Sequence, residues 1–305
     1  MYIAEAVVDE DAIALPAHHV ATRTLFALLT LNRATSKAAR RLLLEHCLYI
    51  DYGWRLHALN RCLGGFPGTR ASNIIQLFLA PFSSDTIDER PVVEGIQTLL
   101  DKIGLGLRKV VVDIPFRSHL PDEDVNTRLR PILRKAFTRL ENVEEFISTN
   151  DELYLDDTVL DTRQELLWFR WSNLRRLGLY NLDLSRRDVI EAITTKLPLL
   201  KVLVLARADG LDEGIQSLYL GMRAPLVVHI VNTPFGHDLG DTEGAQERLE
   251  PSQETLEIRG QSCRMVSFHR VDVDADIEEA SSWDYDPIDA CQCFLLSEGV
   301  SRALW

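Results

Sequence analysis

The chain lacks the features that mark membrane and secreted proteins. None of its 305 residues lies in a stretch approaching the roughly 18 uninterrupted apolar residues of a membrane-spanning helix. The first twenty residues carry Glu5, Asp9, Glu10 and Asp11, and this acidity argues against a secretory signal or a transit peptide. Five cysteines, an odd number scattered along a long chain, favour free thiols in a reducing compartment. We therefore expect a cytoplasmic or nuclear protein that does not associate with membranes.

Positive charge is also scarce. The formal net charge is -13 at pH 7, and general nucleic-acid binding is disfavoured because phosphate contacts need clustered Lys and Arg. The charge is uneven, since residues 21–70 contain eight Lys or Arg against two acids, whereas residues 241–289 contain fourteen acids against four bases. Two solvated surfaces would explain this distribution. The alternative is that the acidic segment folds back on the basic end or recruits a basic partner.

Sequence motifs for catalysis and metal binding are missing as well. The chain has no phosphate-binding Gly-x-x-x-x-Gly-Lys-Ser/Thr loop and no Gly-x-Ser-x-Gly elbow. Cys291-x-Cys293 has no second cysteine pair at zinc spacing. The acidic run that begins at Asp272 has Ile277 where a calcium loop requires glycine. We expect no catalytic site, no metal and no cofactor, so the protein is predicted not to be an enzyme.

The sequence does contain a recurring apolar pattern. Leu174-x-x-Leu177-x-Leu179 returns 26 residues later as Leu200-x-x-Leu203-x-Leu205, with a helical stretch between the two. This recurrence is typical of a strand-plus-helix solenoid, a class that usually binds other macromolecules. Weaker copies occur at Leu44, Cys47 and Tyr49; Ile74, Leu77 and Leu79; Leu107, Val110 and Val112; Val143, Phe146 and Ser148; Pro225, Val228 and Ile230; and Cys263, Val266 and Phe268.

The segments between the copies predict helices. Pro91 to Ile103 carries one apolar stripe, Asp124 can cap a helix that continues to Ala136, Ser185 can cap another that ends before Pro198, and Asp212 can open a fourth. Alternating strands and helices imply a parallel sheet. We predict an α/β solenoid of irregular leucine-rich-repeat type, with parallel strands and helices on one side, behind a short helical N-terminal module. A doubly wound open sheet is the rival architecture.

The outward strand positions raise a question about the second face of the sheet. Val111, Ile147, Val202 and Val204 are apolar, although alternate residues of a half-exposed strand should be polar. Either the chain covers this face itself, most naturally with its C-terminal segment, or the face binds a partner. Polar side chains at and just after the outward positions are candidate partner contacts, namely Asp113, Glu145, Arg176, Tyr180 and His229.

Three regions are predicted along the chain. Residues 1–20 form a flexible leader, residues 21–50 a helical module, and residues 51–305 the α/β domain with a polar insertion near 236–262. Trp168 and Trp171 are predicted to pack in the core or against a helix, with an exposed binding anchor as the alternative.

The helical module resembles the second half of an F-box. Asn32-Arg33 matches the Ser-Arg turn of that family, and Leu43-Leu44-Glu45-His46 matches its Leu-Tyr-x-His helix end. Leu15-Pro16 matches the opening Leu-Pro but lies about one helix too close to Asn32, so the module resembles an F-box that lacks its first helix. The following region is similar to the leucine-rich repeats of fungal F-box proteins.

The resemblance implies docking on the small adaptor subunit of cullin–RING ubiquitin ligases. Leu25, Leu28 and Leu29 would then face the adaptor, although they could instead pack on the first repeat. We expect a protein-binding module, with the substrate receptor of such a ligase as the specific form. A stand-alone repeat scaffold and an unrecognised α/β enzyme are the alternatives.

Overall fold

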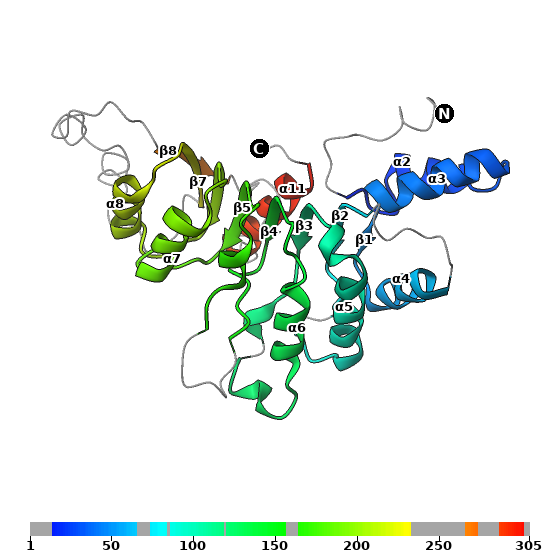
Figure 1. The fold of residues 1–305 in the computed structure, drawn as a ribbon, viewed down its shortest axis with the longest axis horizontal. Coiled ribbons are helices and arrows are strands. Elements are labelled where there is room, and N and C mark those ends of the chain that lie inside the picture. Colours follow the sequence, from blue (N-terminus) through cyan, green and yellow to red (C-terminus); the bar gives the residue numbers. More distant parts are fainter. Residues whose placement is uncertain are drawn as a thin grey trace, which may run out of the picture.

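The centre of the molecule, over the residues that the structure describes, is one open sheet of eight parallel strands (Figure 1). The structure is a computed structural model that describes residues 14–65, 74–83, 86–118, 120–156, 164–232, 266–273 and 287–301. Within these residues the strands neighbour one another in the order of the sequence. They are β1 (Tyr49–Ile50), β2 (Gln76–Leu79), β3 (Lys109–Val112), β4 (Glu145–Ser148), β5 (Arg176–Tyr180), β6 (Val202–Ala206), β7 (Leu226–Asn232) and β8 (Val266–Asp272).

The recurring apolar pattern sets the register of the sheet. Leu177 lies opposite Leu203, and Leu203 lies opposite Val228 on the next strand. The same row continues backwards through Phe146 and Val110. A doubly wound sheet would reverse its strand order at a switch point, and this sheet does not. The predicted α/β class, parallel sheet and sequential order are therefore confirmed, and the arrangement is compatible with a solenoid.

The first and last copies of the pattern were predicted in the wrong register. Tyr49 pairs with Phe78, which places Leu48, and not Cys47, in the row of inward leucines. Val228 pairs with Phe268, whereas the pattern had aligned it with Val266. Side chains alternate with a period of two, so the two-residue slip at β8 keeps the same side chains on the same face. An apolar pattern alone cannot detect a slip of that kind.

In the part of the chain that the structure describes, five helices and a π-helical turn cover one face of the sheet. Their buried side chains, including Leu56, Ile96, Leu133, Val189 and Leu218, form one apolar cluster with the inward rows of the strands. Figure 1 shows α5 and α6 lying side by side along the neighbouring strands. The elements are α4 (Gly53–Gly65), α5 (Arg90–Ile103), α6 (Leu129–Phe137), α7 (Arg187–Glu191) with η6 (Ala192–Lys196), and α8 (Leu211–Gly221). Short 3-10 turns lie at η2 (Gly104–Gly106), η3 (Phe116–Ser118), η4 (Glu123–Val125) and η5 (Leu167–Arg170).

The helix starts follow local chemistry, with one exception. Pro91 lies in the first turn of α5, as predicted. The Asp124 carboxylate accepts hydrogen bonds from the backbone N–H groups of Leu129 and Arg130. It thus supplies acceptors for N–H groups that have no partner within the first turn of α6. The predicted Ser185 cap is wrong, because the Ser185 hydroxyl donates to Asp183 and the helix begins only at Arg187. A local side-chain hydrogen bond of this kind competes with capping.

Two tryptophans pack in the core, as predicted. Trp168 lies in η5 and Trp171 directly follows it, and both side chains are buried. The Trp171 ring lies 4.7 Å from the ring of Phe146 on β4, centroid to centroid. These rings therefore stabilise the centre of the sheet and do not present a binding anchor.

The C-terminal helix α11 (Pro287–Ser301) covers the second face of the sheet (Figure 1). Cys291 and Leu295 are buried against a cluster that includes Val204 and Val231, and Leu296 packs against the neighbouring cluster around Val111. The chain thus covers this face with its own C-terminal segment. The prediction of helices on one side is incomplete, because strands that are apolar on both faces bury both faces.

An antiparallel helical hairpin precedes the sheet. It consists of α2 (Val20–Leu28) and α3 (Arg33–His46), and it has a small apolar core of its own. Asn32 caps α3 through a reciprocal capping box with Thr35. The predicted module therefore contains this hairpin, and β1 at its end belongs to the sheet.

The predicted leader and insertion are only partly described. Ala14 is buried beside the cluster of Phe78 and Val111, and Leu15 is buried in the hairpin core, so the end of the predicted leader packs against the fold. The rest of the leader and the insertion near 236–262 lie outside the described residues. Among the helices in the described ranges, none is both long enough and apolar enough to cross a membrane.

Candidate interaction surfaces

A polar row crosses the outward face of the sheet where strands β2 to β5 begin. The register aligns Gln76, Lys109, Glu145 and Arg176 on neighbouring strands. The Arg176 guanidinium donates to the Glu145 carboxylate at 2.7 Å. The carboxylate is 9 % exposed and the guanidinium side chain 30 % exposed. Two of the predicted partner contacts are therefore joined to each other, and they present little free charge to a partner.

Tyr180 belongs to a different part of the same face. It lies at the end of β5, where its ring is buried in the cluster with Val204, Cys291 and Leu295. Since α11 contributes two of these side chains, the helix occupies the place that a partner would take. The prediction that Tyr180 contacts a partner is therefore not supported in this arrangement.

Asp113 follows β3 at the carboxyl ends of the strands. Its carboxylate accepts hydrogen bonds from the Thr149 hydroxyl at 2.5 Å and from the Asn150 amide at 2.6 Å. Asp113 and Asn150 line a cavity of about 260 Å³ together with Gln292 and Cys293 of α11. The Asp113 side chain thus links the ends of β3 and β4 beneath α11. The cavity lies at the carboxyl ends of parallel strands, where ligand sites of α/β proteins are common.

His229 is paired with a second histidine that the sequence pattern had not singled out. It lies opposite His269 on β8, and the two rings stack with centroids 5.3 Å apart. Burial lowers the pKa of His229, and the neighbouring His269 lowers the same pKa further. In the part of the chain that the structure describes, no group of three His, Cys, Asp or Glu side chains could hold a metal ion.

The hairpin leucines lie in the hairpin's own core. Leu25 is completely buried, and Leu28 and Leu29 are half-buried against the same cluster, which includes Ala39 and Leu42. They therefore pack mainly on α3 and not on the first repeat. Three other apolar side chains of the hairpin are exposed instead, namely Val20, Phe26 and Leu31. Sequence reasoning missed Val20 and Phe26 because neither belongs to the stripe of leucines.

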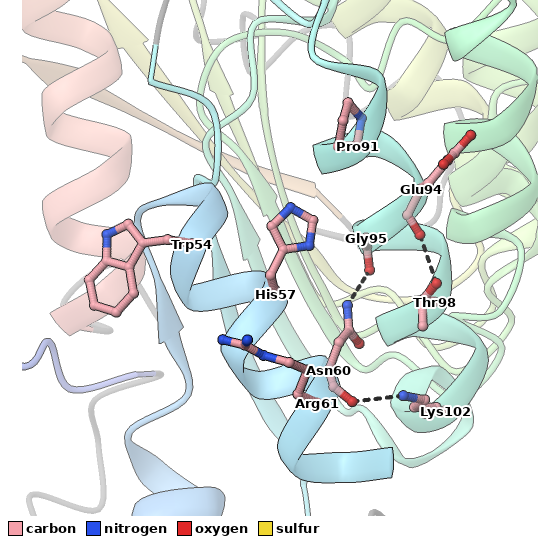
Figure 2. A pocket seen from close by; sticks show the side chains of 9 residues that line it. All are labelled: Trp54, His57, Asn60, Arg61, Pro91, Glu94, Gly95, Thr98 and Lys102. Atoms are coloured by element: carbon pink, nitrogen blue, oxygen red, sulfur yellow. Dashed lines mark hydrogen bonds between the residues drawn. The ribbon is translucent and has the colours of Figure 1, made fainter. Parts of the chain in front are cut away.

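A second surface lies between α4 and α5 (Figure 2). It is an open groove of about 630 Å³, with Trp54, His57 and Arg61 on α4 and Pro91 and Lys102 among its residues on α5. No individual helix had been predicted for Gly53–Gly65, so the groove was missed. The spacing of Trp54, His57 and Arg61, three and then four residues apart, is the signal that could have placed them on one helix face.

Charged groups cluster behind the ends of β3 and β4, where Asp151 and Glu152 are buried and Arg117 is partly exposed. The Arg117 guanidinium donates to the Glu152 carboxylate at 2.6 Å. Burial, and then the charge of Glu152, raises the pKa of the neighbouring Asp151 to about 7. A shifted carboxyl can indicate catalysis when it lies in a cleft. Asp151 is completely buried and lines neither of the two cavities described above, so it fits a structural role.

Comparison with known proteins adds no relative. No family model matches the sequence, and neither a curated protein nor a solved structure matches it. The surfaces of the molecule therefore carry the functional argument.

Proposed function

We propose that this protein is a protein-binding receptor that docks on a partner through its α2–α3 hairpin. The partner is the small adaptor subunit of a cullin–RING ubiquitin ligase, as the resemblance of residues 21–50 to an F-box implies. The observation that carries the proposal is the exposure of Val20, Phe26 and Leu31 on one short hairpin. Each such side chain contributes about 1.5–3 kcal/mol when it is fully buried.

Exposed apolar side chains are concentrated at this end of the molecule. Among the described residues, five of the twelve large exposed apolar side chains lie between residues 20 and 54. A concentration of this kind marks interaction sites more reliably than isolated exposed residues do. The hairpin supports the idea of a docking unit, because its core of Leu15, Ala21, Leu25, Ala39 and Leu42 is separate from the core of the sheet.

The α/β domain would then hold a target protein away from the docking hairpin. Solenoid-like sheets serve this purpose because their extended surfaces offer many side chains in rows. A stand-alone scaffold with the same target-binding role is the second candidate. Binding to the adaptor distinguishes the two candidates, since only the receptor hypothesis requires it.

The test is a pull-down of the full chain with the purified adaptor subunit. Phe26→Asp and Leu31→Asp should each weaken adaptor binding at least tenfold, which corresponds to about 1.4 kcal/mol. Leu220→Asp is the matched control, because Leu220 on α8 and Leu31 are both 66 % exposed. Binding by the control but not by the hairpin variants supports the proposal. No binding by the unaltered chain, or equal loss in all three variants, rejects it and leaves the scaffold.

A further inference from the structure

The α4–α5 groove is built by close approach of the two helices. The backbone of Gly95 on α5 lies so near to α4 that an added Cβ would meet the Leu56 side chain at 2.9 Å. The Asn60 amide donates to the Gly95 carbonyl at 2.8 Å and joins the helices at the floor of the groove. Figure 2 shows Trp54 and Arg61 on the outer side of α4, with His57 between them and α5. The contact between Asn60 and Gly95 therefore forms the floor of the groove, and α4 and α5 form its two sides.

One end of the groove is aromatic and apolar. Trp54 at the start of α4 is 64 % exposed, and Pro91 lines the same end of the groove from the start of α5. The Trp54 ring lies 6.5 Å from that of Tyr52, and the Arg55 guanidinium lies over both rings. These contacts hold the indole in place although most of its surface is open to solvent. An exposed and preorganised tryptophan is a frequent anchor of protein interfaces.

The other end of the groove is cationic. Arg61 and Lys102 lie there, and neither makes an ion pair with any residue that the structure describes. The Lys102 ammonium donates one hydrogen bond to the Asn60 carbonyl, which leaves two of its N–H groups for a ligand. The one acid among the lining residues, Glu94, forms an exposed ion pair with Arg90 at 2.8 Å. A protein with a net charge of -13 thus presents positive charge at this place.

We propose that the groove binds an acidic amphipathic helix of a partner protein. Apolar residues of that helix pack against the end of the groove that Trp54 and Pro91 line, and carboxylates meet Arg61 and Lys102. Trp54 and Arg61 are seven residues apart on α4, which is about 10 Å along the helix axis. A partner helix satisfies both ends when its apolar residue and its acids are about two turns apart on one face.

The charge distribution favours a peptide over a nucleic acid. Two cations remain after the local ion pairs are counted, whereas nucleic-acid sites track a backbone with a row of cations and several stacking rings. Trp54 and His57 supply the two rings of the groove, because Tyr52 is not among the residues that line it. The proposal does not depend on the hairpin, which lies on other elements of the chain.

The experiment measures fluorescence anisotropy with the full chain. The probe is a labelled alanine-rich helical peptide of about 18 residues, with a leucine pair followed two turns later by a glutamate pair. The control peptide has lysine in place of glutamate. The groove variant is Arg61→Glu with Lys102→Glu. Its matched control is Arg187→Glu with Lys201→Glu, which makes the same charge change at exposed residues elsewhere.

The expected result is an exchange of specificity. The unaltered chain and the matched control bind the glutamate peptide at least about tenfold more tightly than the lysine peptide, and the groove variant prefers the lysine peptide. Trp54→Ala weakens binding of the glutamate peptide about tenfold. If the double groove variant does not fold, the exposed Arg61→Gln replaces it and should lower the affinity and its salt dependence.

Several outcomes overturn the proposal. One is the absence of saturable binding up to about 1 mM peptide, which is the weakest affinity of interest. Another is equal binding of the two peptides, or equal loss in the groove variant and its matched control. Displacement of the peptide by an oligonucleotide of the same charge identifies the groove as a general anion site instead. Phe26→Asp should leave peptide binding unchanged, so failure here and failure of the hairpin docking are separate results.

Discussion

The Arg176 guanidinium and the Glu145 carboxylate lie 2.7 Å apart across the neighbouring strands β5 and β4. Both residues begin a strand and point to the face of the sheet that α11 covers further along. The pair lies at the β5 end of the polar row that includes Gln76 and Lys109. At this row, the outward face of the sheet changes from the apolar side chains that pack under α11 to polar side chains at the starts of the strands.

Loss of this ion pair should destabilise the protein. Arg176→Met removes the guanidinium and leaves the nearly buried Glu145 carboxylate with less compensation, so we expect a loss of about 2 kcal/mol in the free energy of unfolding. Urea denaturation measures the change. Asp101→Asn is the control, because the Asp101–Arg139 pair is exposed on both sides and should contribute less than about 0.5 kcal/mol. Equal losses in the two variants would contradict the assignment.

The packing of α11 predicts a difference between two cysteines on the same helix. Cys291 is buried against the sheet, whereas Cys293 is exposed. Burial raises the pKa of the Cys291 thiol, an effect that Arg207 opposes, so less of the reactive thiolate forms. Maleimide labelling followed by mass spectrometry should modify Cys293 at least about a hundredfold faster than Cys291 in the native protein.

The same labelling reports how firmly α11 is held. In urea the two thiols should react at similar rates, which is the internal control. Similar rates without urea would show that α11 leaves the second face freely, and the buried clusters of Val111 and Val204 would then be exposed to solvent.

Asp151 should make the stability of the protein depend on pH. Its folded-state pKa of about 7 lies above its ordinary value of 3.8, chiefly because it is buried. A pKa that folding raises contributes stability that is complete below about pH 3.8 and is lost as the pH rises through about 7. At 1.36 kcal/mol for each unit of pKa, the loss is on the order of 4 kcal/mol.

The measurement is urea denaturation of the unaltered chain and of Asp151→Asn at several pH values between about 5 and 8. The amide has no charge to bury, so the variant should lose less stability than the unaltered chain over this interval. An identical pH dependence in both proteins would exclude Asp151 as its source.

His229 should titrate at lower pH than an ordinary histidine. Burial is the larger cause and His269 the smaller. A depressed pKa contributes stability above about pH 6.5 that is lost as the pH falls through the folded-state value. NMR titration of His269→Gln should show a higher pKa for His229 that still lies below the ordinary value, because the burial remains. An unchanged pKa would show that the stacked pair is not coupled.

The strand pattern was predictable because it is local. Leu177 and Leu203 stand in the same phase of two strands, and a shared phase is sufficient to predict that these strands lie side by side. Sequence reasoning failed where neighbouring copies were equally apolar, as at β8, and where a side chain found a closer partner, as with Ser185 and Asp183. It also failed at Leu25, because which face of a helix is buried depends on the element that packs against it.

The candidate interaction residues were predictable as positions but not as contacts. The register placed Glu145, Arg176 and His229 on the outward face, and this is where they lie. That Glu145 and Arg176 bind each other, and that α11 buries Tyr180, depends on side chains more than 30 residues apart in the sequence. The α4–α5 groove has the same origin, since it forms only when Gly95 brings two helices together.

The sequence by itself determined the alternation of strands and helices and the apolar spine of the sheet. Both follow from the spacing of leucine and valine along the chain, and this spacing acts through neighbours a few residues apart. Only the tertiary structure decided what covers the second face, which leucines of the hairpin are buried, and where exposed aromatic and cationic groups meet. Those outcomes depend on contacts between segments that are distant in the sequence. Apolar periodicity indicates which face of a helix or strand is buried, but it does not indicate which segment packs on that face.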